Sequence, residues 1–295
     1  MQIGPTKIID TFAEAFGMRY SRLIVTAHDK HWLDAAVNEL CGYGSSVIAC
    51  DAEVGVECWL DESESPDGRV GASVLAFGFS VDGLAKAVTN RVGQCVMTCA
   101  STAVFNGCLE SEETFPLGKQ LRYFGDGFQK SKLINDRRYW RIPVMDGEFL
   151  CEEKLGTGKG VAGGNIILQA VDQATALNSA RRGVEAVALL SEVIAPFPGG
   201  VARSGSKVGS RYKTLRASTS DPYCPTLRSR VDSQVVEGAN CVLEIVLDGT
   251  TEESVAAAMK ASIYAAAGEG VLAIGAGNYG GKLGKFHYHL KDLID

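Results

Sequence analysis

A segment in the second half of the chain gathers basic side chains between glycines and serines. Five cations lie between Val201 and Arg216 with no acidic residue among them: Arg203, Lys207, Arg211, Lys213 and Arg216. Because the whole chain has a formal net charge of -6, this local positive charge predicts an anionic ligand. Small residues, Ser206 among them, let backbone N–H groups approach a ligand closely. We therefore expect a binding loop, with a solvated surface loop as the alternative.

Glu244 stands inside the apolar run CVLEIVL, which predicts a strand over Cys241 to Leu247. Alternation along a strand allows two interpretations of this glutamate. It is either the outward residue of the strand, or it points into a closed cleft where burial raises its pKa. Periodicity by itself slightly favours the outward position. In the cleft, Glu244 would be a general base suited to proton transfer.

Three further polar residues lie among glycines. Asn165 in GVAGGN and Asn278 in GAGNYGG are candidates for hydrogen bonds to an oxyanion or a substrate, because no bulky neighbour blocks their amides. A left-handed turn explains each asparagine equally well. Asp126 in FGDGF is another cleft candidate, and a plain turn aspartate is its equal alternative.

Other familiar sequence motifs are excluded by the residues around them. The G-x-G-x-x-G motif over Gly158 to Gly163 precedes the strand-like NIILQA, whereas a dinucleotide site needs a helix there. GAGNYGGKL lacks the first glycine and the final Ser or Thr of a phosphate loop. Two histidine pairs lack a third ligand at metal spacing, so we predict no metal site; they are His28 with His31, and His287 with His289.

Several long ungapped segments follow one another in the order of a known family. They are IIDTFAEAF, RVGQCVMT, YFGDGF, GVAGGN, APFPGG, SGSKVGS, ASTSDPYCPT and AGNYGGKLG. Together they run almost end to end and strongly resemble formylmethanofuran:tetrahydromethanopterin formyltransferase. That family moves a formyl group between the amine of methanofuran and N5 of tetrahydromethanopterin, the C1 carriers of methanogens and some methylotrophic bacteria.

The resemblance implies roles for Glu244 and for the residues of the basic segment. The family has a glutamate matching Glu244 in its active-site cleft, where it is proposed to assist proton transfer. Arg203, Lys207 and Arg211 would meet the carboxylates of a methanofuran tail. Pterin or linker recognition would fall to a further group of polar residues: Ser218, Thr219, Asp221 and Tyr223. Formyl transfer between two nitrogens passes through a tetrahedral oxyanion and needs positioning, an oxyanion donor and a proton acceptor, but no metal or prosthetic group.

The order of predicted elements repeats. Strand, helix, strand are expected over Arg22 to Ala27, Asp29 to Leu40 and Ser45 to Ala49, followed by strand Gly71 to Phe79 and a helix over Leu84 to Met97. The second half shows the same order: strand Asn165 to Ala170, helix Asp172 to Leu190, strand Glu192 to Ala195, strand Cys241 to Leu247, helix Thr251 to Ala266 and strand Val271 to Ile274.

This repeat predicts an α+β fold of two packed ferredoxin-like lobes, each β-α-β-β-α-β, with inserted hairpins and long loops. We place the boundary near residue 150, giving an N-terminal lobe over residues 1–150 and a C-terminal lobe over 151–295. Two hairpin strands are expected before it, Arg138 to Val144 and Glu148 to Cys151. The family resemblance implies two such lobes and a homodimer or homotetramer.

Composition limits the remaining classes. Nine cysteines without a CxxC pair are typical of reduced thiols in a cytoplasmic protein. The N-terminus lacks the pattern of an export signal, no apolar run is long enough to span a membrane, and the acidic balance argues against a duplex-DNA binder.

Two other functions remain to be separated from the enzyme. Related chains of methylotrophs work in a larger complex with amidohydrolase-like subunits, so a non-catalytic or scaffold subunit of such a complex is the main alternative. An RNA-binding pair of ferredoxin-like domains is the other, suggested by Phe77-Gly78-Phe79, although the basic flanks of that motif are absent and core packing is favoured.

Overall fold

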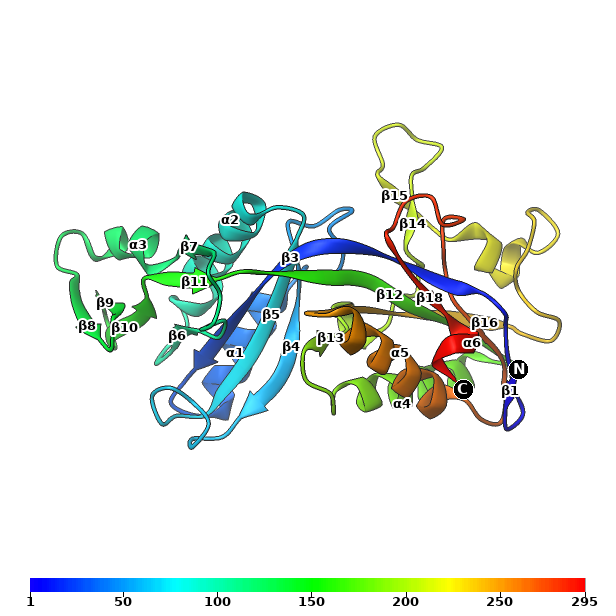
Figure 1. Cartoon of the computed structure of the whole chain (residues 1–295), viewed down its shortest axis with the longest axis horizontal. Coiled ribbons are helices and arrows are strands. Elements are labelled where there is room, and N and C mark those ends of the chain that lie inside the picture. The colour runs from blue at the N-terminus through cyan, green and yellow to red at the C-terminus, as the bar shows by residue number, and fades with distance from the viewer. Residues whose placement is uncertain (295) are drawn as a thin grey trace. The chain divides into compact units, whose positions relative to one another are not determined.

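The computed structural model describes residues 1–294, and internal contacts divide the chain into two compact units (Figure 1). The middle unit is Met18–Lys159. The terminal unit joins Met1–Gly17 to the chain from Gly160 onward. The predicted single boundary near residue 150 stays a prediction. Both units mix helices and strands.

The middle unit is built on four strands and two helices. In chain order they are β3 (Phe12–Thr26), α1 (Lys30–Cys41), β4 (Glu53–Leu60), β5 (Gly71–Gly78), α2 (Val81–Arg91) and β6 (Ala103–Asn106). The strands lie in the order β4-β5-β3-β6, and all three pairings are antiparallel. On the central strand, Leu23 is opposite Val74 of β5 on one side and Asn106 of β6 on the other.

Local sequence explains why these helices form. The carboxylate of Asp29 caps α1 by accepting from the backbone N–H groups of His31 and Trp32. Leu33, Val37 and Leu40 follow at helical spacing and are buried against the sheet. Every residue of β5 is buried.

An insertion follows β6. Its elements are β7 (Thr114–Pro116), α3 (Gly118–Leu121), β8 (Lys130–Ile134), β9 (Arg137–Val144), β10 (Gly147–Glu152) and β11 (Lys154–Gly156). The strands β8, β9 and β10 form an antiparallel meander, and β10 extends the sheet by pairing parallel to β6. The predicted hairpin is therefore confirmed.

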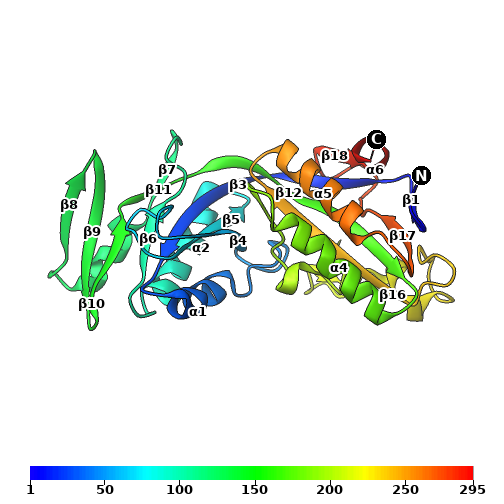
Figure 2. The same ribbon diagram turned by 90° about the horizontal axis from the view of Figure 1, so that it is seen from below.

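The terminal unit repeats the plan of the middle unit. Its elements are β12 (Gly158–Ala170), α4 (Gln173–Val187), β13 (Val193–Ile194), β16 (Cys241–Gly249), α5 (Glu252–Ala266) and β17 (Val271–Gly275). The strand order is β13-β16-β12-β17, again second, third, first, fourth. Figure 2 shows α4 and α5 side by side along this sheet, and both contact β16.

Short strands complete the terminal unit. β2 (Thr6–Ile8) pairs parallel to β17, and β1 (Gln2–Ile3) pairs with β2. β18 (Phe286–His289), which precedes α6 (Leu290–Leu293), pairs with the first residues of β3. Inside the long basic segment, β14 (Lys207–Val208) and β15 (Ala217–Ser218) form a two-residue ladder.

The two faces of β16 differ in their partners. Leu243, Ile245 and Leu247 belong to the apolar core together with Val255 and Met259 of α5. Because successive side chains point to opposite faces, Glu244 lies on the other face of the sheet. The core residues of β16 thus fix the orientation of the glutamate.

One expected strand is wrong. Residues 45–49 form a turn, in which the carbonyl of Ser46 accepts hydrogen bonds from the N–H groups of Ala49, at 3.1 Å, and Cys50, at 2.7 Å. The Glu53 carboxylate also accepts from the N–H of Val47 at 3.0 Å. The backbone groups of this apolar stretch are used locally, and the strand begins only at Glu53.

Within residues 1–294, no helix combines the length and the apolar character needed to cross a membrane.

Candidate active site

Glu244 lies in a fully paired part of the sheet. Strand β12 flanks β16 on one side, and on the other side Ala202 exchanges two backbone hydrogen bonds with Glu244, of 2.8 and 3.0 Å. The glutamate is 4% exposed. Glu244 is therefore buried although it lies on the face opposite the core, so a solvent-exposed outward position is wrong, and its place in a substrate cleft stays a prediction.

The surroundings of Glu244 raise the pKa of its carboxyl to a value near neutral pH. Burial raises the pKa of Glu244 to about 7, while hydrogen bonds from the side chain and backbone of Ser206 act in the opposite direction. The Ser206 hydroxyl donates to Oε1 of Glu244 at 2.7 Å. The charge of Glu244 also acts on two phenols, those of Tyr223 and Tyr279. Burial is the main cause that raises their pKa values, and the negative charge of Glu244 raises them further. A carboxyl that titrates near pH 7 can both accept and return a proton.

The two asparagines shape the backbone of the terminal unit. The Asn165 amide, which is buried, donates to the carbonyls of Gly163 and Gly277, and its oxygen accepts from the N–H of Gly277 at 2.6 Å. Asn278 donates to Thr11 and to the carbonyl of Phe12. Both N–H₂ groups are thus engaged within the chain, and a ligand would have to displace one of these bonds.

The basic segment is irregular apart from its short ladder, as the glycines and prolines predicted. Lys207 forms an ion pair with Asp221, and the hydrogen bond from Lys207 lowers the pKa of Asp221. Arg203 and Arg211 are exposed. Lys207 and Ser206 are consecutive in the chain, so the segment brings a cation next to the hydroxyl that binds Glu244.

The remaining polar candidates of the terminal unit make internal contacts. The hydroxyl of Ser218 donates to the carbonyl of Gly209 at 2.7 Å. The hydroxyl of Thr219 lies 3.4 Å from the Cys224 sulfur. These contacts fold the segment that follows Lys207 back on itself, close to Asp221, the ion-pair partner of Lys207.

Asp126 belongs to the middle unit. It ends a short helical turn over Arg122–Gly125 with a left-handed backbone, at φ 49°, and it is exposed. The interpretation as a turn aspartate accounts for this geometry. The structure does not bring Asp126 together with Glu244 inside one unit.

Glu14 is a residue that sequence reasoning missed. Its carboxylate, on β3, accepts hydrogen bonds from four backbone N–H groups of the loop over residues 279–284. Burial by itself would raise the pKa of Glu14, but the four donors hold it at about 2. The donors lie 265 to 270 positions from Glu14 in the sequence, so no local sequence pattern indicates the contact.

The rejected motifs are explained by their positions. The glycines of the G-x-G-x-x-G pattern lie within β12, so the prediction that no dinucleotide-binding helix follows is confirmed. Phe77 on β5 is fully buried and serves the core, whereas Phe79 is 67% exposed. Core packing is thus confirmed for the first aromatic and wrong for the second.

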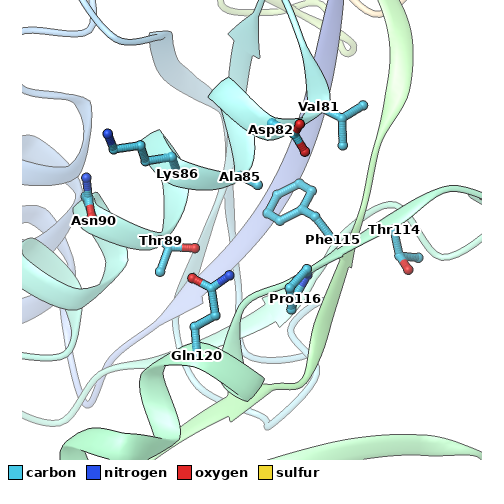
Figure 3. A pocket seen from close by; sticks show the side chains of 10 residues that line it. All are labelled: Val81, Asp82, Ala85, Lys86, Thr89, Asn90, Thr114, Phe115, Pro116 and Gln120. Carbon is cyan, nitrogen blue, oxygen red and sulfur yellow. The ribbon is translucent and has the colours of Figure 1, made fainter.

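A pocket of about 380 Å³ opens in the middle unit between α2, β7 and α3 (Figure 3). Asp82, Lys86 and Thr89 line it from α2, and Phe115 and Gln120 from the other side. Among the described residues, its lining includes none of the predicted site residues. This pocket is therefore separate from the residues around Glu244.

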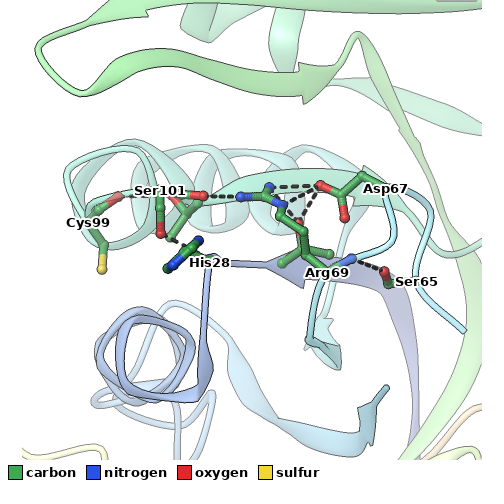
Figure 4. A network of polar contacts seen from close by, with 8 residues as sticks. His28, Ser65, Asp67, Arg69, Cys99 and Ser101 are labelled. Atoms are coloured by element: carbon green, nitrogen blue, oxygen red, sulfur yellow. Dashed lines mark hydrogen bonds and ion pairs between the residues drawn. The ribbon is translucent and has the colours of Figure 1, made fainter. Parts of the chain in front are cut away.

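His28 adjoins a polar network of the middle unit through its backbone (Figure 4). Its N–H donates to the Ser101 hydroxyl at 3.1 Å, and Arg69 binds the Ser101 carbonyl, Asp67 and Thr26. The network fixes three chain segments to one another. Across residues 1–294, no group of three or more His, Cys, Asp or Glu side chains is arranged to hold a metal ion.

Two family models cover the chain. Residues 1–144 match the model described as formylmethanofuran-tetrahydromethanopterin formyltransferase, and residues 147–293 match the model of the proximal lobe of the same family. These two ranges leave almost no part of the chain unmatched.

Individual relatives agree over the full length. The formylmethanofuran--tetrahydromethanopterin formyltransferase of Methylococcus capsulatus is 51% identical, with 100% of both chains covered. The solved enzyme from Methanosarcina barkeri is 42% identical with a TM-score of 0.94, over 99% of this chain and 100% of that one. The formyltransferase/hydrolase complex from Methylorubrum extorquens, solved with methylofuran, contains a chain that is 46% identical with a TM-score of 0.95, over 100% of this chain and 99% of that one. This chain belongs to the formylmethanofuran-tetrahydromethanopterin formyltransferase family.

Proposed function

We propose that this chain transfers a formyl group between the amine of a methanofuran-type coenzyme and N5 of tetrahydromethanopterin. The observation that carries the proposal is the buried carboxyl of Glu244 with its pKa of about 7, held by Ser206. Full-length relatives that bear the name of this activity support it. The chemistry requires one group that takes a proton from a nitrogen and gives it to another, and Glu244 meets that requirement.

The transfer proceeds in two steps. The lone pair of the attacking nitrogen forms a bond to the formyl carbon, the C=O π electrons move to oxygen, and Glu244 accepts the proton that the attacking nitrogen loses. The oxyanion then reforms the C=O bond, the original C–N bond breaks, and the departing nitrogen takes the proton from Glu244. Atoms and charge balance between the two coenzymes, and Glu244 returns to its carboxylate form.

Other residues position the coenzymes in this scheme. Lys207, Arg203 and Arg211 offer positive charge to an anionic tail, and Ser206 is proposed to contact a substrate. The residues proposed to offer hydrogen bonds to the pterin or its linker are Ser218, Thr219, Asp221 and Tyr223. Asn165 and Asn278 are proposed at the oxyanion or pterin. Their internal hydrogen bonds favour a role through the shape of the loop that they hold. Asp126 remains a proposed cleft residue.

We infer that each half is a ferredoxin-like lobe, with the boundary near residue 150. The shared strand order, second, third, first, fourth, supports this fold in both units. We propose a homodimer or homotetramer in the cytoplasm, without a prosthetic group. A relative from Methylorubrum extorquens, 47% identical, is named as one of the subunits of a formyltransferase/hydrolase complex, which supports membership of a larger complex.

The test is direct transfer by the purified chain. Formylated tetrahydromethanopterin and methanofuran are mixed with the protein, and the formylated furan product is followed by chromatography. We expect turnover that depends on both coenzymes. If neither the chain alone nor the chain with co-purified partners transfers the group, the scaffold alternative replaces the enzyme.

A further inference from the structure

The Glu14 carboxylate is the centre around which one loop folds. Oε2 accepts from the N–H groups of Tyr279 and Gly281 at 2.7 and 2.8 Å, and Oε1 accepts from Leu283 and Gly284, both at 2.6 Å. Glu14 is 1% exposed. A single buried anion thus satisfies four backbone donors. Because the acceptor is charged, these hydrogen bonds are stronger than those between neutral groups.

This loop depends on Glu14 for its shape. Gly280 and Gly281 have left-handed backbones, at φ 73° and 71°. A side chain at Gly284 would collide with the carbonyl oxygen of Ala15 and would lie 2.8 Å from Cγ of Glu14. The glycines let the backbone wrap closely around the carboxylate, and their lack of side chains leaves the anion as the main organiser.

Tyr279 connects this loop to the proposed proton acceptor. Its N–H binds Glu14, while its hydroxyl donates to the carbonyl oxygen of Ser206 at 2.6 Å. Ser206 in turn donates its own hydroxyl to Glu244 at 2.7 Å. Hydrogen bonds therefore link Glu14 to Tyr279, Tyr279 to Ser206 and Ser206 to Glu244.

We propose that Glu14 is a positioning residue for formyl transfer, which orders the loop over residues 279–284 so that Tyr279 holds Ser206 against Glu244. This inference rests on the proposed function for its effect on turnover. Its structural part, control of the Ser206–Glu244 hydrogen bond, is independent of any activity.

Glu14→Gln and Tyr279→Phe test the route at two points. Glutamine keeps the shape, but its N–H₂ faces two of the four backbone donors, so part of the loop loses its acceptor. Phenylalanine keeps the turn around Glu14 and removes only the bond to the Ser206 carbonyl. Loosening Ser206 weakens a contact that lowers the pKa of Glu244, so both variants should raise that pKa.

The measurement is carbon-13 NMR titration of the Glu244 carboxyl, assigned with Glu244→Gln, alongside kcat and its pH profile. Among the described residues, Tyr223 and Tyr279 feel the charge of Glu244, and burial raises the pKa of both phenols above their ordinary value of 10. We expect an upward shift in each variant, a kcat lower by about 10–100-fold in Glu14→Gln, and no additional shift when the two changes are combined.

Glu57→Gln is the matched control. Glu57 is a buried carboxylate of the middle unit that accepts from Arg22 and Ser73. Its loss should lower stability without moving the Glu244 titration. A merely structural role for Glu14 predicts this same behaviour, so an unchanged Glu244 titration in Glu14→Gln and Tyr279→Phe overturns the inference. If Glu14→Gln does not fold, an unchanged Glu244 titration in Tyr279→Phe still overturns the inference, because Glu14 is proposed to act on Ser206 only through Tyr279. Absence of transfer by the parent protein would instead overturn the proposed function.

Discussion

Glu14 and Glu244 are two buried carboxylates of one unit whose pKa values move in opposite directions, to about 2 and about 7. Both are almost inaccessible to solvent, at 1% and 4% exposed. The difference comes from their donors, since Glu14 accepts from four backbone N–H groups whereas the burial of Glu244 is opposed only by its hydrogen bonds with Ser206. The first carboxylate is fixed as an anion, and the second can change its charge near pH 7.

Glu244→Gln tests the proton acceptor. Glutamine preserves the shape of the side chain and removes the base, so kcat should fall by about 10²–10⁴ while coenzyme binding changes little. The measurement is steady-state transfer at saturating concentrations of both coenzymes. Glu237→Gln, at an exposed position of the same unit, is the control and should retain parental turnover. A kcat of Glu244→Gln within a few-fold of the parent would exclude the catalytic role.

Ser206→Ala tests the hydrogen bond to Glu244. The serine lowers the pKa of Glu244, so its removal should raise that pKa above about 7. Because the base must be ionised to accept a proton, the acidic limb of the pH profile of kcat/KM should move to higher pH. The variant should recover activity as the pH is raised. A profile that keeps its shape and position would show that Ser206 does not tune the base.

Local signals in the sequence were sufficient for much of the fold. The helix predicted over Asp29 to Leu40 is present as α1, which Asp29 caps and which buries Leu33, Val37 and Leu40, and the predicted hairpin is present as β9 and β10. The turn at residues 45–49 was missed because an apolar run does not reveal that its N–H groups bond to Ser46. The backbone N–H groups of Ala49 and Cys50 form local hydrogen bonds to Ser46, so they do not form the ladder of a strand.

Less of the candidate site than of the fold could be predicted from the sequence. Alternation in β16 places Glu244 on the face opposite the core, but only the tertiary structure shows that Ala202 pairs with its backbone and that the Ser206 hydroxyl binds its carboxylate. Glu14 had no local signal at all, since its four donors come from the other end of the chain. Charge and glycine content identified the basic segment, yet the ion pair of Lys207 with Asp221 required the fold.

The pH dependence of stability gives a test of Glu244 that needs no substrate. Its folded pKa of about 7 lies above the ordinary value of 4.5, so the neutral carboxyl stabilises the fold. That contribution is complete below about pH 4.5 and is lost as the pH rises through 7. Glu244→Gln does not titrate, so its free energy of unfolding relative to the parent should increase by about 2 kcal/mol between pH 5.5 and 8.5. Urea denaturation at both pH values measures it, and a difference that does not change with pH would contradict the raised pKa.

Arg203→Ala tests the basic segment as the site of an anionic tail. Arg203 is exposed, so its contact with a carboxylate should contribute about 1 kcal/mol, and the KM for the furan coenzyme should rise about fivefold with little change in kcat. The effect should shrink in high salt, because mobile ions screen exposed charges. Lys260→Ala, at an exposed position on α5, is the control for loss of one positive charge. Lys207→Ala should have the larger effect, since it also removes the ion-pair partner of Asp221. An unchanged KM in both Arg203→Ala and Lys207→Ala would mean that the tail binds elsewhere.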